Sequence, residues 1–190
     1  MNQTSESAWQ PHAEQATALL VIDVQHGLFR KSTPIFRAEP LLDTITTLVE
    51  RAHTAGVLVV YIQHASDKVL PFGSADWQLH PRLRPGEGDL VVHKQHGNAF
   101  EDTSLHGELA ARGVGSVIVT GLVTHGCVRA TCEGALALGY AVVLAADGHS
   151  SYSKDAARLI EEWNRKLGEA GARVMPAAQI GLAGAALPGE

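Results

Sequence analysis

The sequence predicts a three-layer α/β domain, an αβα sandwich built on a mostly parallel six-stranded sheet. Two observations carry this prediction. Short apolar segments alternate with longer segments of helical periodicity from end to end, which is the pattern of repeated strand–helix units. Most of the short segments are also continuously apolar, as expected for strands that are covered by helices on both faces.

Six segments are expected to form strands, because each is a short run of mostly apolar residues. They are 17–24, 57–63, 89–93, 116–121, 141–146 and 173–175.

Two helices are expected in the first part of the chain. An apolar stripe runs over 41–52 at helical spacing, and Gly56 closes it. The second helix, 103–112, turns Leu105 and Leu109 inward and has Ser or Thr residues available as a cap.

Two further helices are expected in the second part. One spans about 125–138. The other follows Ser153 as its capping residue, repeats apolar residues at helical spacing over 156–170, and ends at Gly171.

The segment 64–88 interrupts this alternation. It is rich in Pro and Gly, contains Trp77, which we expect to be exposed, and is long for a plain connection. Two interpretations remain open: a lid or pocket wall, or a surface excursion that packs on its own side chains.

The length of 190 residues predicts one domain, since domains average about 150 residues. We expect this domain at 17–180, flanked by tails at 1–16 and 181–190, either of which could pack on a partner subunit. A chain of this size buries enough surface to fold without a disulfide or a structural metal.

The charge balance excludes several partners. The chain has 15 Lys and Arg against 20 Asp and Glu, a net charge of −5, and no long basic run, so nucleic acid is not an expected partner. The longest apolar runs fall far short of the roughly 18 residues of a membrane span. Residues 1–16 lack the basic and apolar parts of a signal peptide. We therefore expect a cytoplasmic protein without a membrane partner.

The two cysteines, Cys127 and Cys132, are not expected to form a disulfide. They lie five residues apart in one predicted helix, so their side chains diverge by about 140° around its axis. This usage fits a reducing compartment.

Three reactive groups lie at the ends of predicted strands. Asp23 is embedded in the apolar end of the first strand, Lys94 follows the third, and Cys127 follows the fourth at the expected start of a helix. Because the carboxyl ends of parallel strands share one edge of the sheet, where ligands bind, these groups should converge.

Each group taken alone has a structural explanation: a turn cap, a solvated charge, or a small buried residue. However, an unpaired carboxylate in an apolar run costs several kcal/mol, so Asp23 needs a partner. A thiol near an ammonium at a helix N-terminus should have a lowered pKa, which would make Cys127 a nucleophile.

Three segments, ALLVIDVQ, HKQHGNAF and VTGLVTHGCVRATCEGALALGY, resemble the motif blocks of the isochorismatase-like cysteine hydrolases. This superfamily includes nicotinamidases, N-carbamoylsarcosine amidases, streptothricin hydrolases and isochorismatase itself. The resemblance covers about residues 17–176. It implies a Rossmann-like hydrolase fold, and family members are usually oligomers, so a homo-oligomer is expected.

The resemblance also implies site residues. The catalytic triad would be Asp23, Lys94 and Cys127. A cis peptide would join Leu122 to Val123, and the backbone N–H groups of Val123 and Cys127 would form the oxyanion hole.

No metal and no cofactor are expected. Nicotinamidases of this superfamily carry an Asp-x-His metal motif after the second strand, whereas this chain has YIQHASD there, with His64 present and the spacing absent. Nicotinamide is therefore doubtful as the substrate. His93 and His96 lie on a strand end, where alternation separates their side chains. No glycine-rich phosphate loop is present, so nucleotide cofactors have no support.

Candidates for the substrate pocket are side chains in the loops near the three reactive groups. They are Leu28, Phe29, Trp77, Phe100, His125 and Tyr152.

These observations predict a cysteine hydrolase that cleaves an amide-type C–N bond of a small molecule through a covalent thioester. Two alternatives remain. The first is an isochorismatase-type ether hydrolase, although isochorismatase does not need this cysteine. The second is a non-catalytic or redox-sensing protein of the same fold, in which Cys127 is merely oxidisable.

Overall fold

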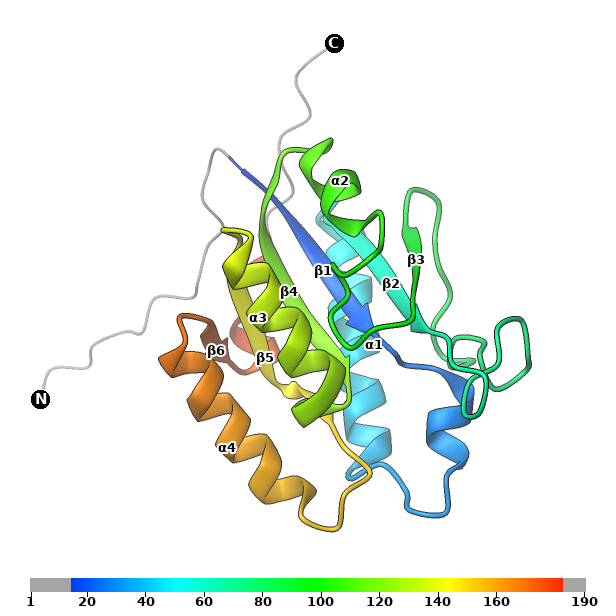
Figure 1. The fold of residues 1–190 in the computed structure, drawn as a ribbon. Helices are drawn as coiled ribbons and strands as arrows, with labels where there is room; N and C mark the ends of the chain where they lie inside the picture. The colour runs from blue at the N-terminus through cyan, green and yellow to red at the C-terminus, as the bar shows by residue number, and fades with distance from the viewer. Residues whose placement is uncertain (1–14, 183–190) are drawn as a thin grey trace, which may run out of the picture.

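A fully parallel six-stranded sheet forms the centre of the computed structural model, which describes residues 15–182 (Figure 1). Its strand order is β3-β2-β1-β4-β5-β6, and every neighbouring pair is parallel. The strands are β1 (Ala16–Ile22), β2 (Leu58–His64), β3 (Leu90–Lys94), β4 (Val114–Leu122), β5 (Ala141–Ser150) and β6 (Arg173–Met175). The predicted α/β class is confirmed.

Helices cover both faces of the sheet and give three layers. Helix α1 (Ala38–Thr54) packs on one face. Helices α2 (Leu105–Ala110), α3 (Arg129–Ala137) and α4 (Ala156–Glu169) lie on the opposite face (Figure 1).

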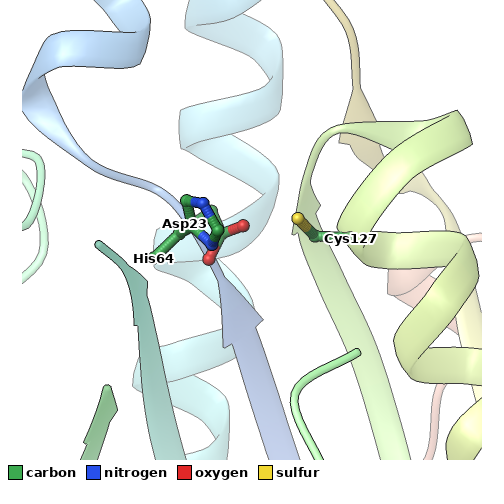
Figure 2. A group of neighbouring side chains, drawn as sticks. All are labelled: Asp23, His64 and Cys127. Atoms are coloured by element: carbon green, nitrogen blue, oxygen red, sulfur yellow. The ribbon is translucent and has the colours of Figure 1, made fainter. Parts of the chain in front are cut away.

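The direction in which successive strands are added to the sheet reverses between β1 and β4. The chain builds β2 and β3 on one side of β1, then crosses to the other side for β4, β5 and β6. In such sheets the ligand crevice forms at this switch point, outside the carboxyl ends of the strands. Asp23 follows β1 and Cys127 follows β4, and Figure 2 shows them on neighbouring strand ends.

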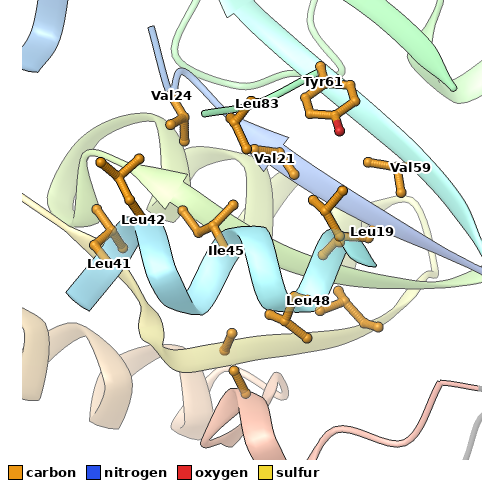
Figure 3. Close-up of a cluster of buried hydrophobic side chains, with 14 of the residues drawn as sticks. Leu19, Val21, Val24, Leu41, Leu42, Ile45, Leu48, Val59, Tyr61 and Leu83 are labelled. Atoms are coloured by element: carbon orange, nitrogen blue, oxygen red, sulfur yellow. The ribbon is translucent and has the colours of Figure 1, made fainter. Parts of the chain in front are cut away.

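Alternation along β1 supplies both hydrophobic cores, since successive side chains of a strand point to opposite faces. Leu19 and Val21 belong to the core under α1, where Figure 3 shows them beside Ile45 and Leu48. The intervening Leu20 belongs to the core under α2, α3 and α4. Burial on both faces explains why this strand is continuously apolar.

Gly121 lets β4 come close to β1 at the switch point. Its φ of +116° is disfavoured for residues with a side chain. A Cβ at this position would also collide with the backbone of Ile22, immediately before Asp23. Glycine is therefore required here on two separate grounds.

The predicted helix over 125–138 is divided in two. A π-type turn, η2 (Thr124–Val128), comes first and contains Gly126 in a non-helical conformation, with φ −112° and ψ −110°. Regular helix begins only with α3. The sequence analysis expected Cys127 at the start of a helix. In the structure it lies in an irregular turn that precedes the regular helix.

Ser153 does not cap α4 in the expected way. The residue before the helix is Asp155, which makes no side-chain capping bond. The Ser153 hydroxyl accepts the N–H of Asp155 at 3.2 Å instead.

The segment between β2 and β3 contains no helix, and the expected exposure of Trp77 is wrong. Trp77 is 7% exposed and belongs to the core under α1. Its carbonyl accepts hydrogen bonds from the buried amides of Gln25 at 2.7 Å and Gln63 at 2.9 Å. These two bonds tie the segment to the ends of β1 and β2.

Most of the two predicted tails, residues 1–14 and 183–190, lies outside the described residues. Ala16, expected in the first tail, is the first residue of β1. Two short turns, η1 (His26–Arg30) and η3 (Ala177–Gln179), complete the elements. Within 15–182, none of the helices combines the length and apolarity needed to cross a membrane.

Candidate active site

Asp23 leaves β1 in a left-handed conformation, with φ of 51°. Aspartate is one of the few residues that adopt this region readily. Its backbone N–H donates to the carbonyl of Ile62 at 2.8 Å, which fixes the turn against β2. The residue is only 2% exposed, so the carboxylate depends on protein groups for its stabilisation.

Lys94 is the partner that Asp23 requires. It is the last residue of β3, and its ammonium donates to Asp23 Oδ2 at 2.9 Å. The same Nζ donates to the carbonyl of His96 at 3.1 Å and lies 3.3 Å from His64 Nδ1. An ammonium has three donors, and these three acceptors use them all.

His64 ends β2, the strand between β1 and β3, and stands beside the ion pair. Partial burial, with the nearby Lys94 charge, lowers the pKa of His64 below its usual 6.5. The imidazole is therefore neutral near pH 7. Because Lys94 donates to Nδ1, the ring proton belongs on Nε2.

Cys127 faces Asp23 and His64 from the other side of the switch point (Figure 2). One ligand atom from each of these residues lies within 4.8 Å of the other two. Burial, followed by the Asp23 carboxylate, raises the pKa of the Cys127 thiol to about 12, against the opposite effect of Lys94. The expected lowering of this pKa is wrong, because burial and the neighbouring carboxylate outweigh the ammonium.

The other cysteine is a separate feature. Cys132 is a fully buried, free thiol in the core under α3, and burial raises its pKa to about 12 as well. Cys127 is also free.

A cavity of about 220 Å³, here called the Cys127 pocket, opens over these groups. Leu28 and Tyr152, both expected to bind substrate, line it, as does Val123. The peptide between Leu122 and Val123 is cis, as the resemblance implied. The segment after β2 contributes a wall at 66–70, which agrees with the pocket-wall interpretation.

The other four expected substrate-binding residues do not line this pocket. Phe29 packs against the core under α1, which also contains Trp77. Phe100 stacks on Tyr140, with ring centroids 5.5 Å apart. His125 is exposed at the start of η2. Tertiary packing places the rings of Phe29, Trp77 and Phe100 elsewhere, and sequence proximity to the reactive groups did not reveal this.

A partly buried hydrogen-bond chain supports the turn that carries Cys127. Asn164 Nδ2 donates to the carbonyl of Ala146 at 3.2 Å, so its Oδ1 is left to accept from His149 Nε2, 2.8 Å away. His149 Nδ1 then accepts the hydroxyl proton of Thr124 at 2.9 Å. Burial lowers the pKa of His149, which keeps the ring neutral, as this chain requires.

Sequence reasoning missed this chain and one pocket residue. The chain escaped sequence reasoning because Thr124, His149 and Asn164 come from distant segments. Lys31, which lines the Cys127 pocket, follows a short turn with no periodic pattern that could have indicated its position.

The donor set of Asp23, His64 and Cys127 has the spacing of a metal site. However, the Lys94 ammonium already contacts Asp23 Oδ2 and His64 Nδ1. A divalent cation on those atoms would meet a second positive charge at hydrogen-bond distance. The residues present therefore suit an ammonium better than a metal ion.

Comparison with known proteins matches this chain to one family. Residues 17–179 match the isochorismatase domain. A streptothricin hydrolase of Streptomyces noursei is 39% identical over 142 residues, covering 74% of this chain and 51% of the relative. The ureidoacrylate amidohydrolase RutB of Klebsiella pneumoniae is 28% identical over 166 residues, covering 67% of this chain and 70% of the relative.

The chain spans about half the length of the streptothricin hydrolases that it matches. A solved structure, a cysteine hydrolase from Pseudomonas syringae pv. phaseolicola, superposes with a TM-score of 0.83 at 22% identity. The match covers 93% of this chain and 96% of that one. At this identity the likeness concerns the fold.

Proposed function

Because this chain belongs to the isochorismatase domain family, we propose that it is a cysteine hydrolase that cleaves an amide-type C–N bond of a small molecule. The triad would be Asp23, Lys94 and Cys127. The relatives named streptothricin hydrolase and ureidoacrylate amidohydrolase support hydrolysis of this bond type.

The observation that carries this proposal is the difference in hydrogen bonding between the two carboxylate oxygens of Asp23. Oδ2 is held by the Lys94 ammonium at 2.9 Å. Oδ1 is buried and has no hydrogen-bond partner among the described residues. Since the thiol of Cys127 lies at the same site, Oδ1 is available to take its proton.

Acylation would begin from a protonated thiol, because the pKa of Cys127 is raised to about 12 by burial and by Asp23. As Sγ attacks the carbonyl carbon, the thiol proton moves to Asp23 and the carbonyl electron pair moves to oxygen. The N–H groups of Val123 and Cys127 would stabilise this oxyanion. Asp23 then returns the proton to the leaving nitrogen, and the C–N bond breaks to leave a thioester.

Deacylation would use the same groups in the reverse order. Asp23 takes a proton from water as the water oxygen adds to the thioester carbonyl. The second tetrahedral intermediate expels the Cys127 sulfur, which recovers its proton, and the carboxylic acid product leaves. Lys94 would orient the Asp23 carboxyl group in both steps.

The size of the Cys127 pocket limits the reacting part of the substrate. Its volume is about 220 Å³. A small amide, or one end of a larger molecule, fits this space.

A redox-sensing role has less support. Sensor cysteines combine a low pKa with solvent access, whereas burial raises the pKa of Cys127. Residence in the cytoplasm and assembly as a homo-oligomer stay predictions from the sequence.

The test is ammonia release from a panel of small carboxamides and carbamoyl compounds. We expect the wild type and Cys132→Ala to turn over at least one member, and Cys127→Ala to turn over none while retaining its circular dichroism spectrum. Turnover by Cys127→Ala within about tenfold of the wild-type rate would refute the nucleophile assigned here.

A further inference from the structure

Lys31 is a lysine at the Cys127 pocket without an anionic partner. It follows η1, is half-buried, and lines the same cavity as Asp23 and Cys127. None of the ion pairs formed among residues 15–182 includes Lys31. Its neighbour Arg30, in contrast, pairs with Asp76 at 3.1 Å.

Tyr152 holds Lys31 in position without neutralising it. The Lys31 Nζ lies over the Tyr152 ring, 5.0 Å from the centroid, and both residues line the pocket. The face of an aromatic ring attracts a cation through its quadrupole and carries no net charge. The ammonium is therefore placed at the pocket with its full charge available.

The other titratable groups of the site add no net charge near neutral pH. The Asp23 carboxylate is balanced by Lys94 at 2.9 Å. His64 is neutral, because burial lowers its pKa, and Cys127 is a thiol, because burial raises its pKa to about 12. The pocket therefore carries about one positive charge, and this charge belongs to Lys31.

We propose that Lys31 binds a carboxylate of the substrate, so that the enzyme acts on small amides that also carry a carboxylate group. This inference rests on the proposed function, because it names the class of amide. With the scissile carbonyl at Cys127, the carboxylate would lie against Lys31 and Tyr152 at the pocket wall. A neutral amide of the same shape would leave the Lys31 charge without a partner.

The first test needs no turnover. Iodoacetate and iodoacetamide alkylate thiols by the same displacement of iodide and have nearly the same shape, but only iodoacetate carries a carboxylate. The quantity measured is the ratio of their rate constants at Cys127. Trypsin cuts after Arg129, so Cys127 and Cys132 appear on different peptides in the mass spectrum.

Three variants make this test specific. We expect the iodoacetate-to-iodoacetamide ratio to fall about fivefold or more in Lys31→Met, since a unit positive charge is removed from the lining of the pocket. Lys31→Arg keeps the charge and should stay within about twofold of wild type. Lys68→Met is the matched control, because Lys68 is exposed on the neighbouring segment and does not line the pocket. An unchanged ratio in Lys31→Met, or an equal fall in Lys68→Met, would overturn the assignment.

The second test uses turnover of succinamate and succinamide, which differ only in a remote carboxylate. Counted per amide group, kcat/KM should favour succinamate about fivefold or more in wild type and in Lys68→Met, and the preference should vanish in Lys31→Met. Equal use of both amides by wild type would refute the substrate class while leaving amide hydrolysis intact. If neither amide nor the wider panel is hydrolysed, the proposed function fails, and the alkylation ratio alone still decides the role of Lys31.

Discussion

The ammonium of Lys94 donates to one carboxylate oxygen of Asp23 at 2.9 Å, although the two residues are 71 positions apart in the chain. Their side chains are 0% and 3% exposed, so water cannot replace either partner. The pair spans β3 and β1 across the end of β2, and the sheet order alone makes this contact possible. Lys94 donates to Oδ2, whereas Oδ1 is buried and has no hydrogen-bond partner among residues 15–182.

Removal of the ammonium should destabilise the fold. Lys94→Met would leave the Asp23 carboxylate buried without a counterion, and breaking a buried pair in this way costs about 3–5 kcal/mol. We expect the free energy of unfolding, measured with urea, to fall by this amount. The double variant Asp23→Asn/Lys94→Met, which buries no charge, should recover part of the loss. A cost below about 1 kcal/mol for Lys94→Met would be expected only of a solvent-exposed pair and would contradict the observed burial.

Asp23→Asn should lower kcat by about 10² to 10⁴, the usual contribution of a general acid–base group. Asparagine tolerates the left-handed backbone at this position, so the turn should be kept. The matched control is Asp76→Asn, which removes a half-exposed carboxylate outside the pocket. Equal activity of Asp23→Asn and wild type, measured where both are folded, would exclude Asp23 as the base.

Activity should survive exhaustive dialysis against EDTA. The Lys94 ammonium lies against Asp23 Oδ2 and His64 Nδ1, two atoms that a metal ion at this site would need as ligands. The check is ammonia release before and after dialysis, with residual metal measured in the same samples. Loss of activity that zinc, manganese or iron restores would show that a metal takes part in the reaction.

Stability should fall as the pH drops below about 6.5, the ordinary pKa of histidine in an unfolded chain. Burial lowers the pKa of both His64 and His149 in the folded protein. For each histidine, the unfolded state therefore binds more protons at pH values between the lowered folded pKa and the unfolded pKa. Acid favours unfolding in that window. Urea titrations from pH 5.5 to 7.5 measure the slope.

The contribution of His149 to this slope can be isolated. His149→Gln keeps an acceptor for Thr124 and a donor for Asn164 but cannot titrate, so the pH dependence should become shallower. His125→Gln changes an exposed histidine outside this chain and should keep the wild-type slope. Identical slopes in wild type and His149→Gln would mean that burial does not shift the pKa of His149.

The strands were predictable because burial on both faces forces continuous apolar runs, but their ends were not. β5 extends to Ser150, four residues beyond its expected end, because a register shift after the Val119–Leu144 pair leaves extra residues in β5 before His149 and Ser150 pair with Gly121 and Leu122. No local sequence pattern reports a register shift of this kind.

The convergence of Asp23, Lys94 and Cys127 was predictable from the common edge of parallel strands. The protonation state of Cys127 was not predictable, because it follows from a pKa that burial raises, and burial depends on segments distant in sequence. Lys31 was missed for a related reason. Its place at the pocket follows from packing on Tyr152, more than a hundred residues later in the chain.

The most direct test of the covalent mechanism is the mass of the enzyme during turnover. A hydrolysed amide from the panel is mixed with enzyme, quenched in acid within the first turnovers, digested with trypsin, and analysed by mass spectrometry. The account predicts an acyl group on the peptide that ends at Arg129 and contains Cys127, and none on the peptide that contains Cys132. Its removal by hydroxylamine would identify a thioester. Steady turnover with no acyl group on Cys127 at any quench time, together with turnover by Cys127→Ala, would contradict the account.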